Sequence, residues 1–443
     1  MSEVVFHAIC FFAVLFEVGV PLKIMCFIAQ NACASFLYAS SRWQLTLLNA
    51  AWLVSCLHFK VLSFFFGTTS FALCILLPIV CVVEAPPANT DAIEYPVGYF
   101  DYEYAVRDKG SYRKHEQKQT IGRIFYPAAI QQQPREHSAE APYFWNTSAS
   151  VVRAIATQFI PAWSAFLVDH FDCTTVSMKW CALPADTKRK YPVVIFSHDL
   201  GGTRETSTRL AISLAKQGII CCCVEHTDES AALARYINGD TVQYDLSIAP
   251  VHSQQGIQTF KSKRRSQTKM RIEEIQRTVL FLLALNSSDF CRNVRKQVSN
   301  CSIDGANELE VTSLLSEFRG RLDMCKVSLG GHGLGAASAF CGAVTLSELR
   351  YLKVYTVFTL DLAFDWIPEE FWHILGKKTS GDVKPLGNEE CLNETSLLGI
   401  FSETWVKQDW NFSLFCKILS KHRKSYALGI RGSSHISLCD VLL

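Results

Sequence analysis

The sequence predicts an α/β fold with a mostly parallel central sheet, preceded by an apolar helical region at the N-terminus. Between residues 4 and 83 only four charged residues occur, Glu17, Lys23, Arg42 and Lys60, whereas the rest of the chain has the charge density of an ordinary soluble domain. In that second part, apolar runs of strand length alternate with helical patterns. Such alternation is typical of a parallel sheet covered by helices on both faces.

The N-terminal region, residues 1–84, is predicted to form three or four transmembrane helices. Residues 61–83 are an uncharged stretch of 23 residues, and about 20 helical residues cross a hydrocarbon core. A buried helical subdomain is the alternative interpretation, but these segments lack the polar face that it would need. Residues 85–91 contain paired prolines and form a linker. Residues 92–443 then form one soluble domain.

Charge and cysteine spacing exclude two classes of function. The formal net charge of +2 gives no reason to expect nucleic acid as a partner. The 18 cysteines include no CxxC pair and no His/Cys spacing of a zinc site, so we predict neither a metal nor another cofactor. Cys221 to Cys223 lie in an apolar run that predicts a buried strand.

The first half of the soluble domain is predicted to contain a strand, loop, helix and strand in succession. A later helix is expected from about Met270 to Asn286, and the basic segment Lys261–Arg265 before it is expected to be a solvated loop. The predicted strands and the first helix are Ile121–Pro127, Pro192–His198, Thr206–Gly218 (helix) and Ile219–Val224.

The segment from Lys326 to Phe340 has the layout of a nucleophile elbow, a short strand followed by a turn and a helix of small residues. An elbow has the pattern G-x-S-x-G, and Gly331 and Gly335 occupy its flanking positions. Gly333 stands where the serine belongs. Glycine adopts the positive φ of an elbow without strain, so the turn of an α/β-hydrolase is predicted to persist without its nucleophilic hydroxyl.

The remaining parts of a hydrolase site follow in the expected order, acid and then histidine. Asp361 ends a predicted strand, and His435 follows the last one. The oxyanion donors are predicted to be the backbone N–H groups of Leu334 and Leu200. Asp199, next to Leu200, is expected to point away, because a carboxylate near a developing oxyanion would be unfavourable.

These segments resemble the platelet-activating factor acetylhydrolases, the family that includes lipoprotein-associated phospholipase. The resemblance covers most of residues 92–443 and is carried by Tyr95–Gly98, Ile121–Pro127, Tyr191–Gly202, Val224–His226, Arg271–Leu285, Gly331–Ala336, Leu360–Asp361 and Ile430–His435. It implies a calcium-independent serine esterase that removes short or oxidised acyl groups from the second position of glycerophospholipids.

The resemblance also implies the residue roles: nucleophile at Gly333, acid at Asp361, base at His435, and oxyanion donors at Leu200 and Leu334. The sequence departs from the family pattern at two positions. The serine is absent from position 333, and the usual glycine after Ser197-His198 is Asp199.

Three functions are compatible with this sequence. The first is a membrane-anchored homologue of the esterase, impaired by the loss of its serine. The second is an active phospholipid esterase that uses a non-standard nucleophile or a water activated by His435; Ser338 and Ser328 are placed too poorly to substitute. The third, a transporter built on the N-terminal helices, is disfavoured by their lack of charged residues.

The expected partners are a membrane and a phospholipid with a short or oxidised acyl chain, with no nucleic acid. Five N-x-S/T sequons favour a lumenal or extracellular hydrolase domain on a multi-pass membrane protein: Asn146, Asn286, Asn300, Asn393 and Asn411.

Overall fold

The structure is a computed structural model. It divides into two compact units, of which the larger comprises residues 91–158 and 175–442. The described residues are 95–106, 118–129, 141–142, 148–158, 162–163, 175–187, 189–236, 239–247, 254–287, 313–347, 352–376, 384–386, 392, 394–408, 410–420 and 424–440.

The predicted transmembrane region and the linker lie outside the described residues. Within the described ranges, no helix combines the length and apolar character that a membrane span requires.

A nine-stranded sheet forms the centre of the larger unit, in the order β13-β12-β11-β10-β6-β7-β2-β1-β5. Its six strands from β13 to β7 are parallel, and β2 is antiparallel to both β7 and β1. The strands are β1 (Val97–Val106), β2 (Lys118–Pro127), β5 (Lys179–Trp180), β6 (Tyr191–Ser197), β7 (Ile220–Glu225), β10 (Leu322–His332), β11 (Val354–Leu360), β12 (Ser396–Ser402) and β13 (Ser425–Ile430). This mostly parallel sheet confirms the predicted α/β fold of residues 92–443.

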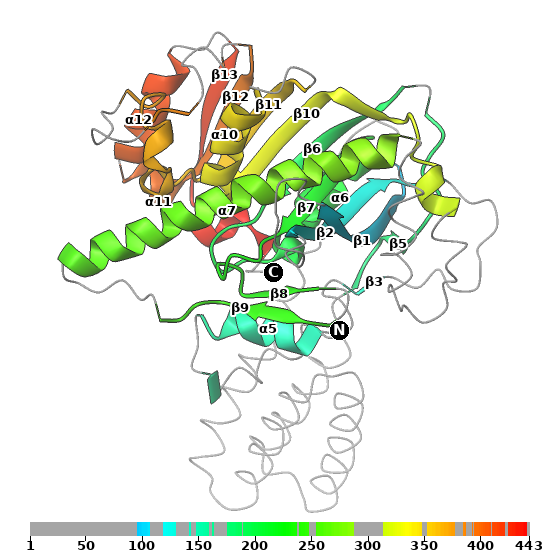
Figure 1. Ribbon diagram of the computed structural model, residues 1–443, viewed down its shortest axis with the longest axis horizontal. Coiled ribbons are helices and arrows are strands. Elements are labelled where there is room, and N and C mark those ends of the chain that lie inside the picture. The colour runs from blue at the N-terminus through cyan, green and yellow to red at the C-terminus, as the bar shows by residue number, and fades with distance from the viewer. Residues whose placement is uncertain are drawn as a thin grey trace, which may run out of the picture. The chain divides into compact units, whose positions relative to one another are not determined.

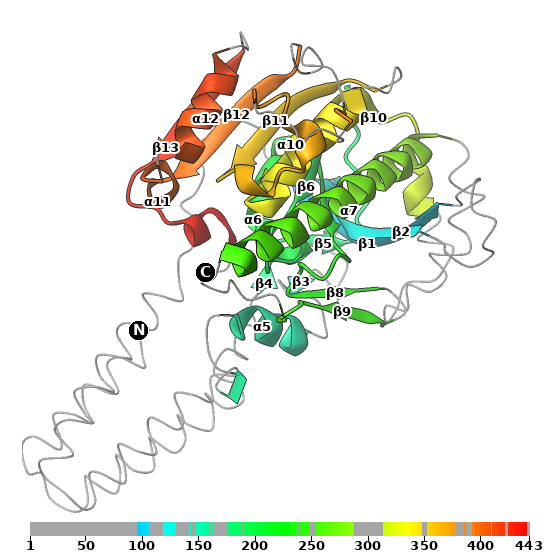
Figure 2. The ribbon, with the colours of Figure 1, turned by 60° about the vertical axis from the view of Figure 1, so that its left-hand side comes forward.

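Helices cover both faces of the sheet, and α7 and α10 lie together on one of them (Figures 1 and 2). The helices are α5 (Ser148–Ala156), α6 (Thr208–Lys216), α7 (Gln254–Asn286), α10 (Leu334–Ser347), α11 (Glu403–Val406) and α12 (Trp410–Leu419). Four 3-10 turns are η2 (Arg204–Ser207), η4 (Phe364–Trp366), η5 (Glu369–Phe371) and η6 (His435–Leu438). Two short strand pairs complete the unit: β3 (Ala141–Pro142) with β4 (Thr175–Val176), and β8 (Leu233–Arg235) with β9 (Thr241–Gln243).

The central strands are apolar on both sides because each face of the sheet packs against helices. Along β7, Cys222 belongs to the core under α7 and α10, whereas Cys221 and Cys223 belong to the core under α6. This division follows from the alternation of side chains along a strand. The three cysteines are buried as predicted, and all eight cysteines of the described residues are free thiols.

Helix α7 begins at Gln254, so the prediction of a loop over Lys261–Arg265 was wrong. This first half of the helix has few apolar residues, and it contacts distant segments through polar and charged side chains. Lys261 lies 2.9 Å from Asp365, and Lys263 lies 2.9 Å from Glu229. Local hydrophobic periodicity does not record such contacts, because the partners lie far away in the sequence.

Two of the predicted glycosylation sites lie in ordered, packed surroundings. Asn411 in α12 is only 3% exposed, and the Asn286 side chain accepts a hydrogen bond from the Leu322 backbone N–H at 3.0 Å. Asn411 is therefore inaccessible to a glycan in the folded domain. The other three sequons lie outside the described residues.

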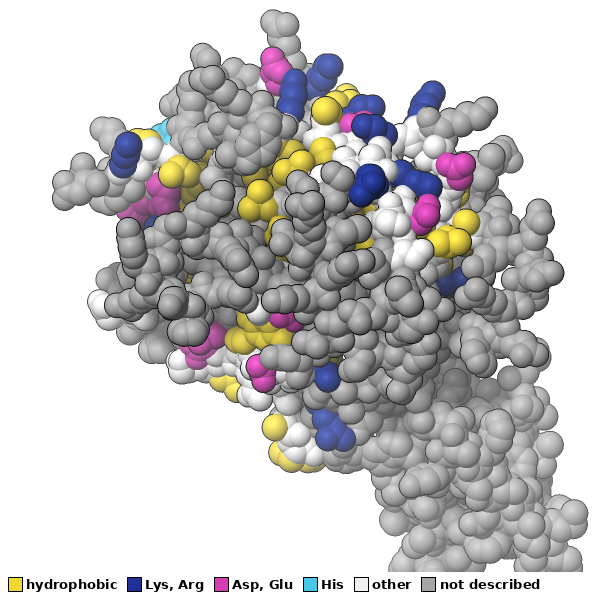
Figure 3. Space-filling view, turned by 45° about the vertical axis from the view of Figure 1, so that its right-hand side comes forward, with side chains coloured by type: hydrophobic (Ala, Val, Ile, Leu, Met, Phe, Trp, Pro, Cys, Tyr) yellow, Lys and Arg dark blue, Asp and Glu magenta, His cyan; other side chains and the backbone are white. Residues whose placement is uncertain are grey.

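Charges of both signs share the surface of the larger unit. On the face in Figure 3, basic, acidic and hydrophobic side chains of the described residues are intermingled. Several exposed charges form ion pairs, for example Lys353 with Glu394 and Lys407 with Glu403.

A cluster of buried charges connects strands β1 and β2 to the 3-10 turn η2. Arg123 on β2 is fully buried and donates to both carboxylate oxygens of Asp101 on β1, at 2.8 and 3.1 Å. Arg204 and Glu205 of η2 complete the cluster at 3.7 Å from Asp101 and Arg123 respectively. Burial opposes the charge of Arg123, but these carboxylates raise its pKa above the usual value.

We expect Arg123→Met to lower the free energy of unfolding by about 3 kcal/mol, because it leaves buried carboxylates with one cation fewer. Chemical denaturation measures the change. Lys353→Met, which removes an exposed pair, is the matched control and should leave the denaturation midpoint unchanged. Equal midpoints for the two variants would show that the buried cluster contributes no more than a surface pair.

Candidate active site

The elbow places Gly333 at the turn between β10 and α10. Its φ of +52° is in the left-handed region, as the sequence predicts for this position. A Cβ on Gly335 would lie 2.0 Å from the carbonyl oxygen of Ser197, so the helix approaches the neighbouring strand too closely for a larger residue. The backbone of a nucleophile elbow is therefore intact.

Asp361, directly after β11, lies beside His435, the first residue of η6. His435 Nδ1 lies 2.9 Å from Asp361 Oδ2. Asp361 is fully buried, and its carboxylate accepts hydrogen bonds from the backbone N–H and the hydroxyl of Ser402 at 2.7 and 2.6 Å. The Trp405 ring stacks on the His435 imidazole at 4.7 Å. These contacts hold the imidazole with Nε2 facing the elbow.

The carboxylate of Asp199 fills the space beside Gly333. Asp199 Oδ2 lies 2.7 Å from His435 Nε2, and Oδ1 accepts a hydrogen bond from the Leu334 backbone N–H at 2.8 Å. A Cβ on Gly333 would lie 1.8 Å from Asp199 Oδ1. The expectation that Asp199 points away was therefore wrong. Its carboxylate contacts the histidine that a serine hydroxyl would contact, and also the predicted oxyanion donor.

Leu200, the other predicted oxyanion donor, follows Asp199 in the loop after β6. Its backbone N–H makes no hydrogen bond to the residues that the structure describes. The loop is held next to this position, where Gly201 donates to Ser230 and Gly202 donates to the Asp199 carbonyl. Of the two predicted oxyanion donors, Leu334 and Leu200, only Leu334 therefore donates to the Asp199 carboxylate.

The ion pair between Asp199 and His435 stabilises both charges. Burial opposes the positive charge of His435, but Asp199, together with hydrogen bonds to Asp199 and Asp361, raises the pKa of His435 to about 10. Burial also opposes ionisation of Asp199, yet His435 holds the pKa of that carboxyl well below its usual range. At neutral pH His435 is an imidazolium that donates from both ring nitrogens. It has no lone pair with which to accept a proton as a general base.

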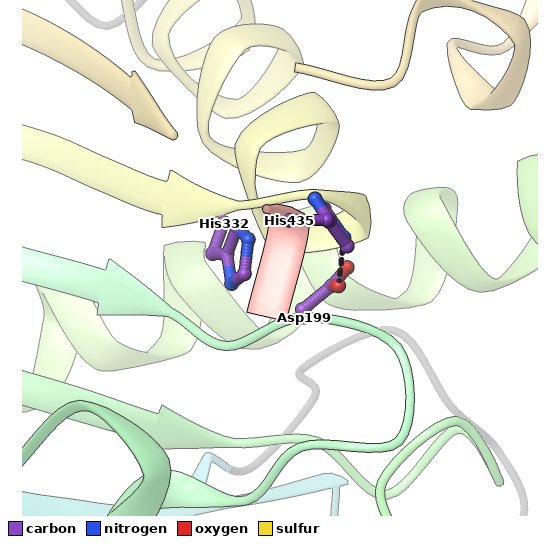
Figure 4. Close-up of side chains that lie close together, drawn as sticks. All are labelled: Asp199, His332 and His435. Atoms are coloured by element: carbon purple, nitrogen blue, oxygen red, sulfur yellow. Dashed lines mark hydrogen bonds and ion pairs between the residues drawn. The ribbon is translucent and has the colours of Figure 1, made fainter. Parts of the chain in front are cut away.

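His332 packs against the same histidine from the end of β10. The two rings lie 4.4 Å apart, and His332 is 2% exposed (Figure 4). Burial lowers the pKa of His332 to about 4, so this imidazole is neutral. It is the third side chain of the site, and no local motif of the sequence predicts a role for it.

A second group resembling a catalytic triad lies beneath the Asp199 loop. Ser197 Oγ is 2.7 Å from His226 Nε2, and His226 Nδ1 is 2.6 Å from Glu274 Oε2. Ser197 and His226 are fully buried, so no ester can reach the hydroxyl. Arg271 of α7 donates to the His198 carbonyl beside this group. The network therefore positions the loop that holds Asp199.

The two serines considered as substitutes stay away from the site. Ser338 is fully buried in α10 and its hydroxyl donates to the Leu334 carbonyl at 2.9 Å. Ser328 lies within β10, paired with both neighbouring strands.

The sequence of this chain matches a known protein family. The family model for platelet-activating factor acetylhydrolase, isoform II, matches residues 93–370, which is more than half of the chain. The chain belongs to this family. The matched residues of this chain contain the elbow, Asp199 and Asp361, and His435 lies after them.

Individual relatives agree with this assignment. Platelet-activating factor acetylhydrolase of Cavia porcellus is 32% identical over 174 residues, covering 39% of this chain and 35% of that protein. The same enzyme of Canis lupus familiaris is 24% identical over 257 residues, covering 55% and 49%. The matches thus span between about a third and a half of these relatives.

A solved structure supports the fold alone. A ferulic acid esterase from Streptomyces cinnamoneus superposes with a TM-score of 0.50 at 17% identity, covering 81% of this chain and 79% of that one. It extends the likeness to the general α/β-hydrolase architecture.

The charge state of His435 is directly measurable. We expect NMR titration of its ring protons to show a pKa near 10, falling clearly in Asp199→Gly because the attracting carboxylate is removed. A pKa raised on folding adds stability below the unfolded value of about 6.5, and this contribution is lost as pH rises through about 10.

The stability difference between the native chain and Asp199→Asn should therefore be largest near pH 6 and shrink toward pH 10. A native His435 that titrates near pH 6.5 would contradict the ion pair.

Proposed function

We propose that this chain is a membrane-anchored family member that recognises phospholipids with short or oxidised acyl chains and does not hydrolyse them by a serine mechanism. The observation that carries the proposal is the position of Asp199. Its carboxylate lies beside Gly333 and engages both His435 and the Leu334 N–H. The family match supports an ester or phospholipid ligand.

Three requirements of serine ester hydrolysis are unmet in this arrangement. Position 333 has no hydroxyl to attack a carbonyl. The Leu334 N–H, which would stabilise an oxyanion, already donates to a carboxylate. His435 carries the proton that a base must lack. Loss of the nucleophile alone generally lowers kcat by several orders of magnitude.

Membrane attachment rests on the N-terminal sequence. The uncharged stretch 61–83 is long enough to cross a bilayer as a helix, and the segments before it are similarly apolar. Placement of the hydrolase domain on the lumenal or extracellular side rests on the remaining sequons.

The alternative is an active esterase that uses water activated by His435. The imidazolium disfavours it, because both ring nitrogens already donate to carboxylates. Activity measurements on the native chain distinguish the two mechanisms.

Restoring the serine should require two substitutions together. Gly333→Ser alone places a side chain on the Asp199 carboxylate and should remain inactive. Asp199→Gly alone still lacks the nucleophile. We expect Asp199→Gly/Gly333→Ser to hydrolyse a short-acyl phospholipid and to react with a fluorophosphonate probe, with a rate at least about 100-fold above that of the native chain.

Adding His435→Ala to the double variant is the matched control and should abolish the gained activity. Thermal melts establish that each variant is folded. Two results would overturn the proposal: a folded double variant without activity, or native turnover at ordinary esterase rates that disappears in His435→Ala.

A further inference from the structure

The loss of serine chemistry does not account for His332, a buried histidine whose ring nitrogens lack well-placed hydrogen-bond partners. Neither of its ring nitrogens has a partner of good hydrogen-bond geometry, and the nearby His435 backbone supplies only a weak hydrogen bond. Buried polar groups in folded proteins are almost always well hydrogen-bonded, because an unpaired one has lost its contacts with water without replacing them. A ligand at this position would therefore supply a contact that the folded chain does not provide.

The unpaired ring faces two other potential metal ligands. One ligand atom each from Asp199, His332 and His435 can be chosen so that all lie within 4.8 Å of one another (Figure 4). We propose that these three side chains bind a divalent transition-metal ion, for which Zn²⁺ fits best. Two imidazole nitrogens and one carboxylate oxygen are a usual zinc set, and three protein ligands leave a fourth position for water. Magnesium and calcium instead prefer sites made of oxygen.

Partners outside the three ligands orient two of them toward a common point. Asp361 accepts from His435 Nδ1 at 2.9 Å, which leaves Nε2 to face the ion. The Leu334 N–H holds Asp199 Oδ1 at 2.8 Å and leaves Oδ2 available. A carboxylate behind a ligating histidine is the usual outer-shell arrangement of zinc sites.

The distances are those of ligands already close to their bound positions. Ligand atoms about 2.0 Å from a tetrahedral ion lie about 3.3 Å apart. His435 Nε2 and Asp199 Oδ2, now 2.7 Å apart, must separate slightly, and His332 must approach by roughly 1.5 Å at most.

The charges also match. Binding of the ion displaces the Nε2 proton of His435 to solvent, which leaves two neutral imidazoles as ligands. The carboxylates of Asp199 and Asp361 then balance the two positive charges of the ion. Local spacing could not reveal this set, because its ligands lie after β6, at the end of β10 and after β13, which are separate segments of the chain.

The test is metal binding by the purified 443-residue chain after treatment with a chelator. Isothermal titration with Zn²⁺ should give one ion per chain, and Co²⁺ should give the visible absorption of a four-coordinate site. His332→Phe keeps an aromatic ring but removes both nitrogens, and Asp199→Asn keeps the shape of the side chain but removes its charge. Each should weaken Zn²⁺ binding by more than the ~10–100-fold typical of losing an outer-shell partner.

His373→Phe, a histidine outside the cluster, is the matched control and should bind like the native chain. The proposal is overturned if the native chain binds no Zn²⁺, or if His332→Phe and Asp199→Asn, shown to be folded by circular dichroism, retain native affinity and the native Co²⁺ spectrum. In the latter case the ion would lie on other residues, such as the free cysteines.

This test is independent of the esterase measurements. The Asp199→Gly/Gly333→Ser variant lacks a metal ligand, so its regained activity reports only on the serine mechanism. Failure of metal binding therefore leaves the proposed function standing, and failure of the double variant leaves the metal site standing.

Discussion

The Asp199 carboxylate sits between an imidazolium and a backbone N–H, and the rest of the site is arranged around that contact. It occupies space that exists only because residue 333 has no side chain. A serine at 333 would collide with the carboxylate, and a glycine at 199 would leave His435 Nε2 and the Leu334 N–H without a partner from this loop. The two departures from the family pattern, Gly333 and Asp199, therefore depend on each other, because the carboxylate fits only where the serine is absent. In a partly dry site, both hydrogen bonds are stronger than they would be in water.

The scaffold around this contact is that of a hydrolase and has kept its rigidity. Helix α7 fixes the loop through Arg271, which donates to the His198 carbonyl, and through Glu274, which orients His226. Asp361 and Ser402 hold the histidine from the other side. These supports would hold a catalytic histidine equally well. The fold thus maintains the geometry of a reaction whose attacking atom is missing, and function must be argued from the site instead of from the fold.

Because the scaffold holds His435 in place, exchanging its serine neighbour for a carboxylate changes the chemistry of the histidine. A histidine between two carboxylates is stabilised as a cation, whereas a histidine between a carboxylate and a serine hydroxyl can exchange a proton. His332 adds an uncharged imidazole at 4.4 Å from the first ring. The family's acid and histidine positions are thereby converted from a proton-transfer pair into a cluster of ion-binding side chains.

Much of the fold follows from the sequence alone. Buried strands appear as continuous apolar runs because both faces of the sheet are covered, and the elbow is recognisable because Gly331, Gly333 and Gly335 meet local backbone demands. The order of acid and histidine identified Asp361 and His435 as neighbours. Only the tertiary structure decided the direction of Asp199 and the length of α7. Both depend on contacts with residues far away in the chain, and local periodicity and spacing carry no record of such contacts.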